Sequence, residues 1–372
     1  MRREKNQYIF ASEMTRGQGH KVRNSILLIL PILIVAVWVL NITVSRRVTL
    51  DEIRLTVLNL PDDLESYSIL HLSDLHGARY GEKQKAFATA LGTTRYSCVV
   101  MTGDMLGKNG DVEPLLELVA LMPPDTPKFL IPGDMDGSLT ESKAHSSLSV
   151  YADWVNKLTE AGVQILDKPV LVTREKGRIW FVPEELYAMD LEGTQKVFQK
   201  QIRDMNDRAT SLTADDAARL RALEYEVQRI DALKEMRKEF LPTDIQVVLT
   251  HTPLTREYVH DLVSWGEKED PFSMRYASLI LAGHYNGGQW RLPFAGAIYV
   301  PELGWFPEDS MVQGLSYLEG IPQYVSPGLG SDPHYKYQPE RVFNPPVMTR
   351  IVLTRKANCS GGFPIAPWTP SA

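Results

Sequence analysis

The stretch Tyr67-Ser68-Ile69-Leu70-His71-Leu72-Ser73-Asp74-Leu75-His76 places a polar Asp-x-His segment directly after an apolar run. A short aliphatic run that ends at a polar residue predicts a buried β-strand. Four later runs end in the same way: Cys98 to Thr102 before Gly103-Asp104, Phe129 to Pro132 before Gly133-Asp134-Met135-Asp136, Ile245 to Leu249 before Thr250-His251-Thr252, and Leu279 to Ala282 before Gly283-His284-Tyr285-Asn286. Because open α/β sheets bind ligands at the carboxyl ends of their strands, we expect these segments to share one site.

The side chains in these segments have the chemistry of metal ligands. Carboxylate and imidazole groups suit ions such as Mn, Fe and Zn. The sequence therefore predicts a site for two divalent metal ions, with candidate ligands Asp74, His76, Asp104, Asp134, His251, His284 and Asn286.

The order of the segments resembles the calcineurin-like metallophosphoesterases, whose pattern is Asp-x-His, Gly-Asp, Gly-Asn-His-Asp, a single His and Gly-His-x-His. The continuation Gly287-Gly288-Gln289-Trp290-Arg291-Leu292-Pro293 is similar to the membrane-associated branch related to the UDP-2,3-diacylglucosamine hydrolases. Tyr324 to Gly330 and Arg341 to Pro346 resemble the closing strands of that family. The resemblance implies a four-layer α/β/β/α sandwich over residues 48–355, in which two mixed sheets pack face to face.

The resemblance also implies a chemistry and a role for each residue. In such sites two metals about 3.5–4 Å apart polarise a phosphoryl group while a water attacks it in line. The expected roles are Asp74, His76 and Asn286 on one metal, Asp134, His251 and His284 on the other, and Asp104 as the bridge. The implied substrate is a phosphate mono- or diester.

Three positions depart from the family pattern. Asp134 stands where the family has Asn, Met135 where it has the catalytic His, and Asn286 where it has the last His ligand. A thioether cannot donate a proton to a leaving group, and general acid–base catalysis contributes about 10²–10⁴-fold. Either another group, His145 or Tyr285, serves as the acid in a slow phosphoesterase, or the chain is a binding or scaffold protein.

Composition is ordinary for a folded domain, with 44% hydrophobic and 23% charged residues among 372. A net charge of −6 gives no sign of nucleic-acid binding. Cys98 lies in a predicted strand and Cys359 in the tail, so we expect no disulfide.

The N-terminal region has the pattern of a membrane anchor. No charged residue lies between Arg23 and Arg46, and Ile26 to Val44 is almost entirely aliphatic, which is about enough to cross a bilayer core of roughly 30 Å. The alternatives are a buried core helix or a signal peptide, but the end of the run lacks a small-x-small cleavage site. Basic residues are concentrated before the run: Arg2, Arg3, Lys5, Arg16, Lys21 and Arg23.

The excess of positive charge before the run predicts a cytoplasmic segment at 1–23, a transmembrane anchor at 24–45 and an extracytoplasmic domain. A substrate carried on a lipid or on another envelope component would suit this location.

Residues 191–241 differ from the rest of the chain in being charged, Ala-rich and nearly free of Gly and Pro. Their apolar residues follow three-and-four spacing, which predicts an amphipathic helical hairpin inserted in the domain, with Thr213 as an N-cap. The hairpin would cap the site, bind a protein partner, or simply pack on its own domain. Residues 356–372, rich in Gly, Pro and Ser, are expected to be a flexible tail.

Overall fold

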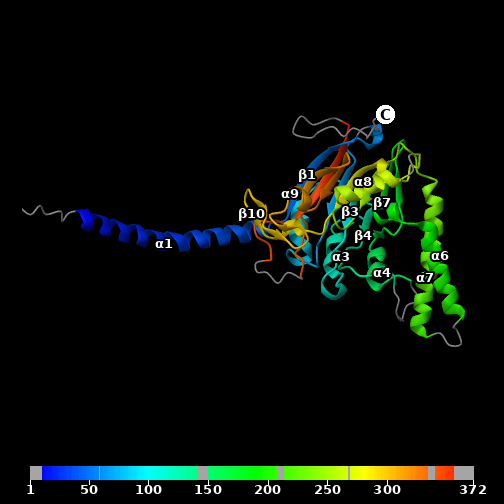
Figure 1. The fold of residues 1–372 in the computed structure, drawn as a ribbon, viewed down its shortest axis with the longest axis horizontal. Helices are drawn as coiled ribbons and strands as arrows, with labels where there is room; N and C mark the ends of the chain where they lie inside the picture. Colours follow the sequence, from blue (N-terminus) through cyan, green and yellow to red (C-terminus); the bar gives the residue numbers. More distant parts are fainter. Residues whose placement is uncertain are drawn as a thin grey trace, which may run out of the picture.

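A computed structural model describes residues 11–57, 59–140, 150–207, 213–266, 269–333 and 340–355 of the chain, with side chains from residue 27 onward. Within these residues, two six-stranded sheets form the centre of the domain, and helices cover the outer face of each (Figure 1). The predicted four-layer α/β/β/α sandwich of mixed sheets is confirmed.

The first sheet mixes parallel and antiparallel pairs. Its strands are, in spatial order, β1 (Thr49–Thr56), β16 (Val347–Thr354), β2 (Ser68–Leu72), β3 (Cys98–Thr102), β4 (Lys128–Ile131) and β5 (Gln164–Ile165). β16 is parallel to β1 and antiparallel to β2, whereas β2, β3, β4 and β5 are parallel to one another. The carboxyl ends of β2, β3 and β4 therefore meet at one edge, where the first three polar segments follow them.

The second sheet is also mixed. Its strands are, in order, β14 (Gly314–Leu318), β15 (Ile321–Val325), β9 (Ala277–Ala282), β8 (Ile245–Leu249), β7 (Arg178–Pro183) and β6 (Val170–Thr173). The four inner strands are parallel, and each edge strand is antiparallel to its neighbour. β8 and β9 thus deliver the last two polar segments to a common edge.

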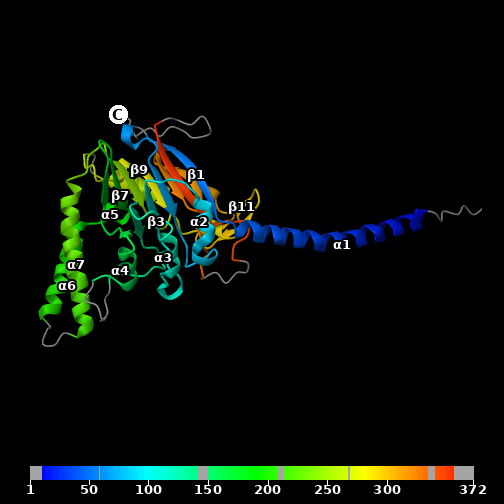
Figure 2. The same cartoon turned by 180° about the vertical axis from the view of Figure 1, so that it is seen from behind.

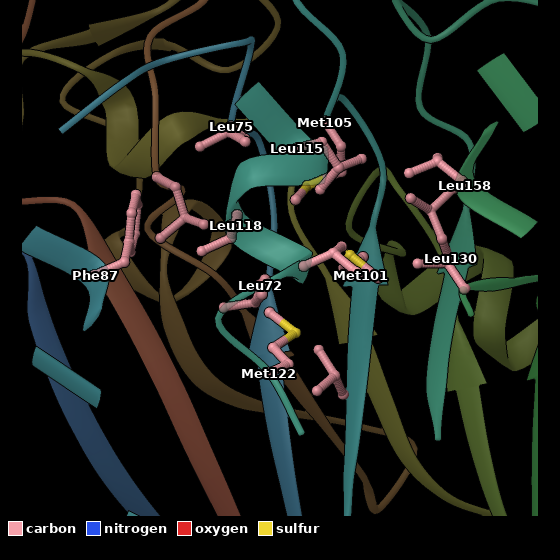
Figure 3. Packing of buried hydrophobic residues seen from close by; sticks show 14 of the residues in the cluster. Leu72, Leu75, Phe87, Met101, Met105, Leu115, Leu118, Met122, Leu130 and Leu158 are labelled. Carbon is pink, nitrogen blue, oxygen red and sulfur yellow. The ribbon is translucent and has the colours of Figure 1, made fainter. Parts of the chain in front are cut away.

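Apolar side chains fill the space between the sheets and beneath the helices. Between the sheets, Ile69, Val100 and Phe129 of the first sheet join Phe181 and Leu281 of the second in one buried cluster. Alternate residues of the same strands face outward. They pack against α2 (Lys85–Leu91), α3 (Glu113–Val119) and α4 (Asp153–Glu160), as Figure 3 shows for Leu72, Met101, Leu115 and Leu130. The core therefore fixes the strand ends on which the polar segments are carried.

The outer face of the second sheet carries α8 (Arg256–Trp265), α5 (Glu185–Ala188) and the predicted helical hairpin, α6 (Leu191–Asp207) and α7 (Ala214–Arg237). Thr213 caps α7 through a capping box with Asp216, as the sequence predicts. Leu191, Ile230 and Leu233 of the hairpin pack against Trp180 of β7. The hairpin therefore packs on its own domain, at the end opposite α1 (Figures 1 and 2).

The N-terminal helix α1 (Ala11–Ser45) is longer than the predicted anchor and contains Pro31. Its segment Leu27–Ser45 is long and apolar enough to cross a membrane, and only 6% of that segment is buried against the rest of the chain. The last turn of α1 contacts the domain, where the backbone N–H of Phe343 donates to Asn41 Oδ1 at 2.7 Å. This exposure excludes the core-helix alternative but does not separate an anchor from a signal sequence.

Small elements follow the last polar segment. Two short hairpins, β10 (Arg291–Leu292) with β11 (Gly296–Ala297) and β12 (Tyr299–Val300) with β13 (Gly304–Trp305), precede α9 (Asp309–Val312). No pattern in the sequence predicts these short hairpins. It was also wrong to treat Arg341 to Pro346 as a closing strand: this segment makes one bridge, between Val342 and Trp290, and its two prolines have no N–H to donate to a ladder.

Candidate metal centre

Backbone hydrogen bonds bring the polar segments together. Asp74 N–H donates to Gly103 O at 3.0 Å, and His76 N–H donates to Asp104 O at 2.9 Å. At the edge of the second sheet, Gly283 N–H donates to His251 O at 2.9 Å. Backbone bonds therefore join four of the five segments in two pairs, one at the edge of each sheet. The side chain of Asp74 links the pairs by accepting the His284 N–H at 2.9 Å.

Glycine at position 283 is required by close approach. A Cβ built there would lie 1.8 Å from Ser73 Oγ and 2.6 Å from Asp74 Oδ2. The segment after β9 can therefore approach the segment after β2 only if residue 283 has no side chain. This contact joins the two sheets at the site.

The side chains form two clusters that share one carboxylate. Ligand atoms of Asp74, His76 and Asp104 lie within 4.8 Å of one another, and so do those of Asp104, His251 and His284. Asn286 extends the first cluster, because its Nδ2 lies 3.2 Å from His76 Nε2. The arrangement has the form of two adjacent ligand sets joined at Asp104.

Asp104 is held by groups on three sides. It is 4% exposed, its Oδ1 accepts the Met135 N–H at 2.9 Å, and its Oδ2 lies 3.2 Å from His251 Nε2 and 3.9 Å from His76 Nε2. Burial alone would raise the pKa of Asp104, but the hydrogen bond and charge of His251 lower it below its ordinary value. Asp104 is therefore a carboxylate at neutral pH.

The tautomer of His251 follows from its neighbours. Its Nδ1 lies 2.8 Å from Thr102 O, and a carbonyl oxygen can only accept, so Nδ1 carries a proton. Nε2 then faces Asp104 and lies 3.2 Å from His284 Nδ1. A backbone acceptor that fixes the far nitrogen is typical of a metal-ligating histidine.

The charges of the cluster are poorly balanced in the protein alone. Burial raises the pKa of Asp74 to about 7, with a contribution from the charge of Asp104. Burial lowers the pKa of His76 to about 4, and burial and His251 lower that of His284. Burial also opposes the protonation of His251, but the hydrogen bond and charges of Asp104 and Asp74 raise its pKa to about 9. His76 and His284 are therefore neutral imidazoles that can act as ligands, whereas a metal ion would have to displace a proton from His251.

The residues present fit a pair of metal ions. Asn286 is 2% exposed, and its Oδ1 has no hydrogen-bond partner among the residues that the structure describes. An unpartnered buried acceptor carries a free-energy penalty of about 1–3 kcal/mol, which a bound ligand would remove. Five proposed ligands also have left-handed backbone, an uncommon conformation that clusters at functional sites: Asp74 (φ 54°), His76 (φ 47°), Asp104 (φ 54°), His284 (φ 77°) and Asn286 (φ 51°).

Two hollows flank the clusters. One, of about 300 Å³, is lined by residues that include His284, Tyr285, Asn286, Trp290 and Trp305. The second, of about 450 Å³, is lined by His251 and by residues such as Glu184 and Tyr258. No described residue of the 191–241 hairpin lines either hollow, so the hairpin does not cap the site.

Comparison with family models agrees with this geometry. The model of the calcineurin-like phosphoesterase family matches residues 67–285, which carry all five polar segments up to Tyr285. The chain belongs to this family.

Structural neighbours of this calcineurin-like phosphoesterase are distant. The phosphopantetheinyl hydrolase of Mycobacterium tuberculosis is 14% identical, with a TM-score of 0.39 over 80% of this chain and 100% of that chain. A putative 5'-nucleotidase from Staphylococcus aureus, solved with alpha-ketoglutarate, is 10% identical with a TM-score of 0.32 over 80% of this chain and 56% of that chain. No curated protein matches. At these values neither neighbour supports an argument about activity or substrate.

The structure separates Asp134 from the other predicted ligands of this calcineurin-like phosphoesterase. Its side chain is 72% exposed, and its nearest contact in the site is Oδ2 to His284 Nδ1 at 3.6 Å. It belongs to neither cluster. The buried carboxylate of this segment is Asp136, which accepts backbone N–H groups of Leu106 at 2.8 Å and Gly133 at 2.9 Å.

The two proposed substitute acids have different outcomes. His145 lies outside the described residues. Tyr285 lies beside the clusters, with its ring centroid 4.9 Å from that of His284, and burial and the charge of Glu302 raise its pKa. Tyr285 therefore keeps its proton and can donate it. Met135, at the family's catalytic position, is half-buried and contributes its backbone N–H to Asp104.

Two supporting residues were missed by the sequence analysis. Asn344 donates from Nδ2 to Asn286 O at 2.7 Å, and Arg341 is a buried cation that donates to Asn344 O and Pro327 O at 2.8 Å. In the sequence, the Arg341-to-Pro346 segment shows only a resemblance to a closing strand of the family. Its polar residues inside an apolar context were the available signal.

Proposed function

We propose that this chain is a metal-dependent phosphoesterase that hydrolyses a phosphate mono- or diester. The observation that supports it most is Asp104, which is shared by two ligand clusters on adjacent strand ends. Two divalent ions of the Mn, Fe or Zn kind would supply Lewis acidity and an activated water in line with the phosphorus. The family pattern assigns Asp74, His76 and Asn286 to one ion and His251, His284 and Asp134 to the other.

The protein's own residues would orient these ligands and manage protons. Thr102 O fixes the His251 tautomer, and the His284 N–H holds the Asp74 carboxylate, with 2.9 Å to Oδ1 and 3.1 Å to Oδ2. Tyr285 would donate the proton that Met135 cannot. Because a phenol with a raised pKa is a weak acid, we infer slow turnover. Asp134, being exposed, would join the second set only by turning inward.

The proposal includes a membrane location. The apolar exposed segment Leu27–Ser45 supports a single-pass anchor over 24–45, and the basic excess before it supports a cytoplasmic 1–23 and an extracytoplasmic domain over 48–355. The substrate would then be a lipid-linked or envelope-linked ester. The Gly287-to-Pro293 continuation supports membership of the branch similar to UDP-2,3-diacylglucosamine hydrolases.

A non-catalytic binding or scaffold role is the second candidate. It is favoured by the replacement of two family histidines, by Met135 and Asn286, and by the exposure of Asp134. The 191–241 hairpin, which extends from the end of the domain away from α1, would be the surface for a protein partner (Figure 1).

Metal analysis combined with turnover of bis(p-nitrophenyl) phosphate distinguishes the two functions. The phosphoesterase proposal expects bound metal and slow hydrolysis that a chelator abolishes. Met135→His with Asn286→His should raise the rate, since one change restores a proton donor and the other a stronger metal donor. Asp134→Asn belongs in the same series, and Met135→Leu is the matched control, because it alters the side chain without adding a proton donor.

The substituted residues lie around one metal site, so the effects of the substitutions on the rate should not be additive. A folded, metal-loaded protein that is inert in every combination would overturn the phosphoesterase proposal and favour binding. A natural protein that turns over fast and is slowed by the restoring substitutions would instead show that it has its own acid.

A further inference from the structure

The two hairpins after the metal segment, residues 290–306, form an exposed apolar surface that we call the aromatic flap. The flap contains only two charged residues, Arg291 and Glu302. Its large apolar side chains are solvent-exposed: Leu292 is 43% exposed, Phe294 109%, Tyr299 38%, Trp305 71% and Phe306 59%. The rings of Tyr299, Trp305 and Phe306 lie against one another. Large apolar side chains gathered on the surface of a folded domain mark an interaction site.

The backbone of the flap holds these aromatic side chains outward. Phe294 lies in the loop between β10 and β11 with φ 70°, and Phe306 directly follows β13 with φ 51°. Bulky residues rarely adopt left-handed backbone. Backbone hydrogen bonds fix both hairpins: Ala295 N–H donates to Leu292 O at 3.2 Å in the first, and Phe306 N–H donates to Ile298 O at 2.9 Å in the second. The exposed side chains and left-handed backbone of Phe294 and Phe306 therefore do not contribute to packing within the domain.

The flap lies next to the end of the apolar helix. Asn41 of α1 accepts the Phe343 N–H, and the neighbouring residue Val342 bridges Trp290 at the start of the flap. In both views the hairpins stand at the side of the domain from which α1 leaves (Figures 1 and 2). The exposed apolar surface of α1 continues to Leu40 at 54% exposure, next to the Asn41 contact that joins α1 to this side of the domain.

The charges at this junction suit a lipid surface. Arg46 and Arg47 directly follow α1 and are exposed. Arg291, the cation within the flap, is paired with Asp309 at 2.6 Å and with Gly287 O. Basic residues and Trp, Tyr or Phe side chains at the end of an apolar helix are the composition of a membrane interface.

We propose that the aromatic flap inserts into the interfacial layer of the same bilayer that α1 crosses. The inference rests on the anchor in the proposed function. Trp290, Ile298 and Trp305 of the flap line the same hollow of about 300 Å³ as His284 and Asn286 of the metal clusters. Insertion of the flap therefore makes this hollow open at the lipid surface, where an amphiphilic phosphate ester presents its head group. A protein partner is the competing occupant of the flap.

Quenching by brominated lipid tests the proposal. The full chain is reconstituted in phosphatidylcholine vesicles, with or without bromine near the headgroup end of the acyl chains, and the quenched part of the tryptophan fluorescence is measured. Trp38→Phe should remove the signal of α1, and Trp305→Phe should remove a second share. Trp265→Phe is the matched control, because Trp265 is 73% exposed at the end of α8, and it should leave the quenched share unchanged.

A second variant adds a fluorescence signal, which a misfolded protein would not produce. Phe294→Trp, at a position without packing contacts to lose, should add a new quenched fluorophore. If Trp38 is quenched but neither Trp305 nor a tryptophan at 294 is, the flap lies outside the bilayer and the proposal fails while the anchor stands. If Trp38 is not quenched, the anchor itself fails and the flap proposal with it.

Discussion

The substitution Asp104→Asn should abolish most of the stability that the protein gains from bound metal. Asp104 is shared by both ligand clusters, so the change removes the one charge that would neutralise both ions. The amide keeps an oxygen that can accept the Met135 N–H. In the metal-free protein the loss is confined to the bond with His251 (3.2 Å), which as a charged hydrogen bond is worth about 1.5–3 kcal/mol.

The stability contributed by bound metal is larger than this loss in the metal-free protein, and the two can be measured separately. An ion at 100 times its dissociation constant adds about 2.7 kcal/mol of stability, so two independent ions would add about 5 kcal/mol. At roughly 2 °C per kcal/mol for a domain of this size, the natural protein should melt about 10 °C higher with Mn²⁺ than with chelator. For Asp104→Asn we expect less than half of that difference and a metal content below that of the natural protein.

The assay is thermal unfolding of the purified full chain with Mn²⁺ and with chelator, alongside elemental analysis. Asp111→Asn is the matched control, because the Asp111 side chain follows the same strand but is 44% exposed and lies outside both clusters. It pairs with Arg79 at 3.8 Å and accepts the Glu113 N–H at 3.1 Å, a bond that the amide oxygen of asparagine can keep. Its metal-dependent difference should equal that of the natural protein. A melting temperature that is indifferent to Mn²⁺ and to chelator in the natural protein would refute the two-metal reasoning.

Three further outcomes are expected. Burial lowers the pKa of His71 from 6.5 to about 3, so below pH 6.5 only the unfolded chain takes up this proton. The free energy of unfolding of the metal-free protein should therefore fall by up to about 1.4 kcal/mol for each unit by which the pH is lowered. Urea titrations at several pH values should show a weaker pH dependence of this free energy for His71→Gln, and an unchanged pH dependence would contradict the assignment. Gly283→Ala should reduce metal content and destabilise the fold by about 1–3 kcal/mol. Adding Ser73→Ala should restore part of the lost stability, and no restoration would contradict the close approach of residues 73 and 283. A reporter active only outside the cytoplasm, fused after Ala372, should be active, whereas a cytoplasmic reporter active there would reverse the topology.

The strands that lead to the site could be predicted because each is a continuous apolar run closed by Gly or a polar residue. β3 and β8 have the predicted bounds, and β2, β4 and β9 differ by one or two residues. The hairpins of the flap escaped prediction because their strands are two residues long, too short for any period to appear. Their geometry depends instead on turns such as the one at Gly304 (φ 85°).

The site was predictable to the extent that strand ends determine it. The positions of Asp74, His76, Asp104, His251 and His284 follow from the parallel strand order, and the structure gathers them. The position of Asp134 did not follow, since which of two nearby carboxylates turns inward depends on which backbone N–H groups are free. Here Leu106 and Gly133 offer theirs to Asp136. The role of Asn344 likewise depends on a contact with Asn286, 58 residues away in sequence.

The hydrogen bond between Asn41 and Phe343 has a mechanical consequence. Phe343 is followed by Asn344, which holds the backbone of Asn286 at the candidate metal clusters, so the side chains of Asn41 and Asn344 connect helix α1 to a candidate ligand. If α1 is the anchor proposed above, a change in its tilt or in the thickness of the lipid would displace the loop that carries Asn286. A fragment trimmed to begin at Val48 would lack Asn41 and lose this restraint. Metal affinity measured on such a fragment would then differ from that of the intact chain in a membrane.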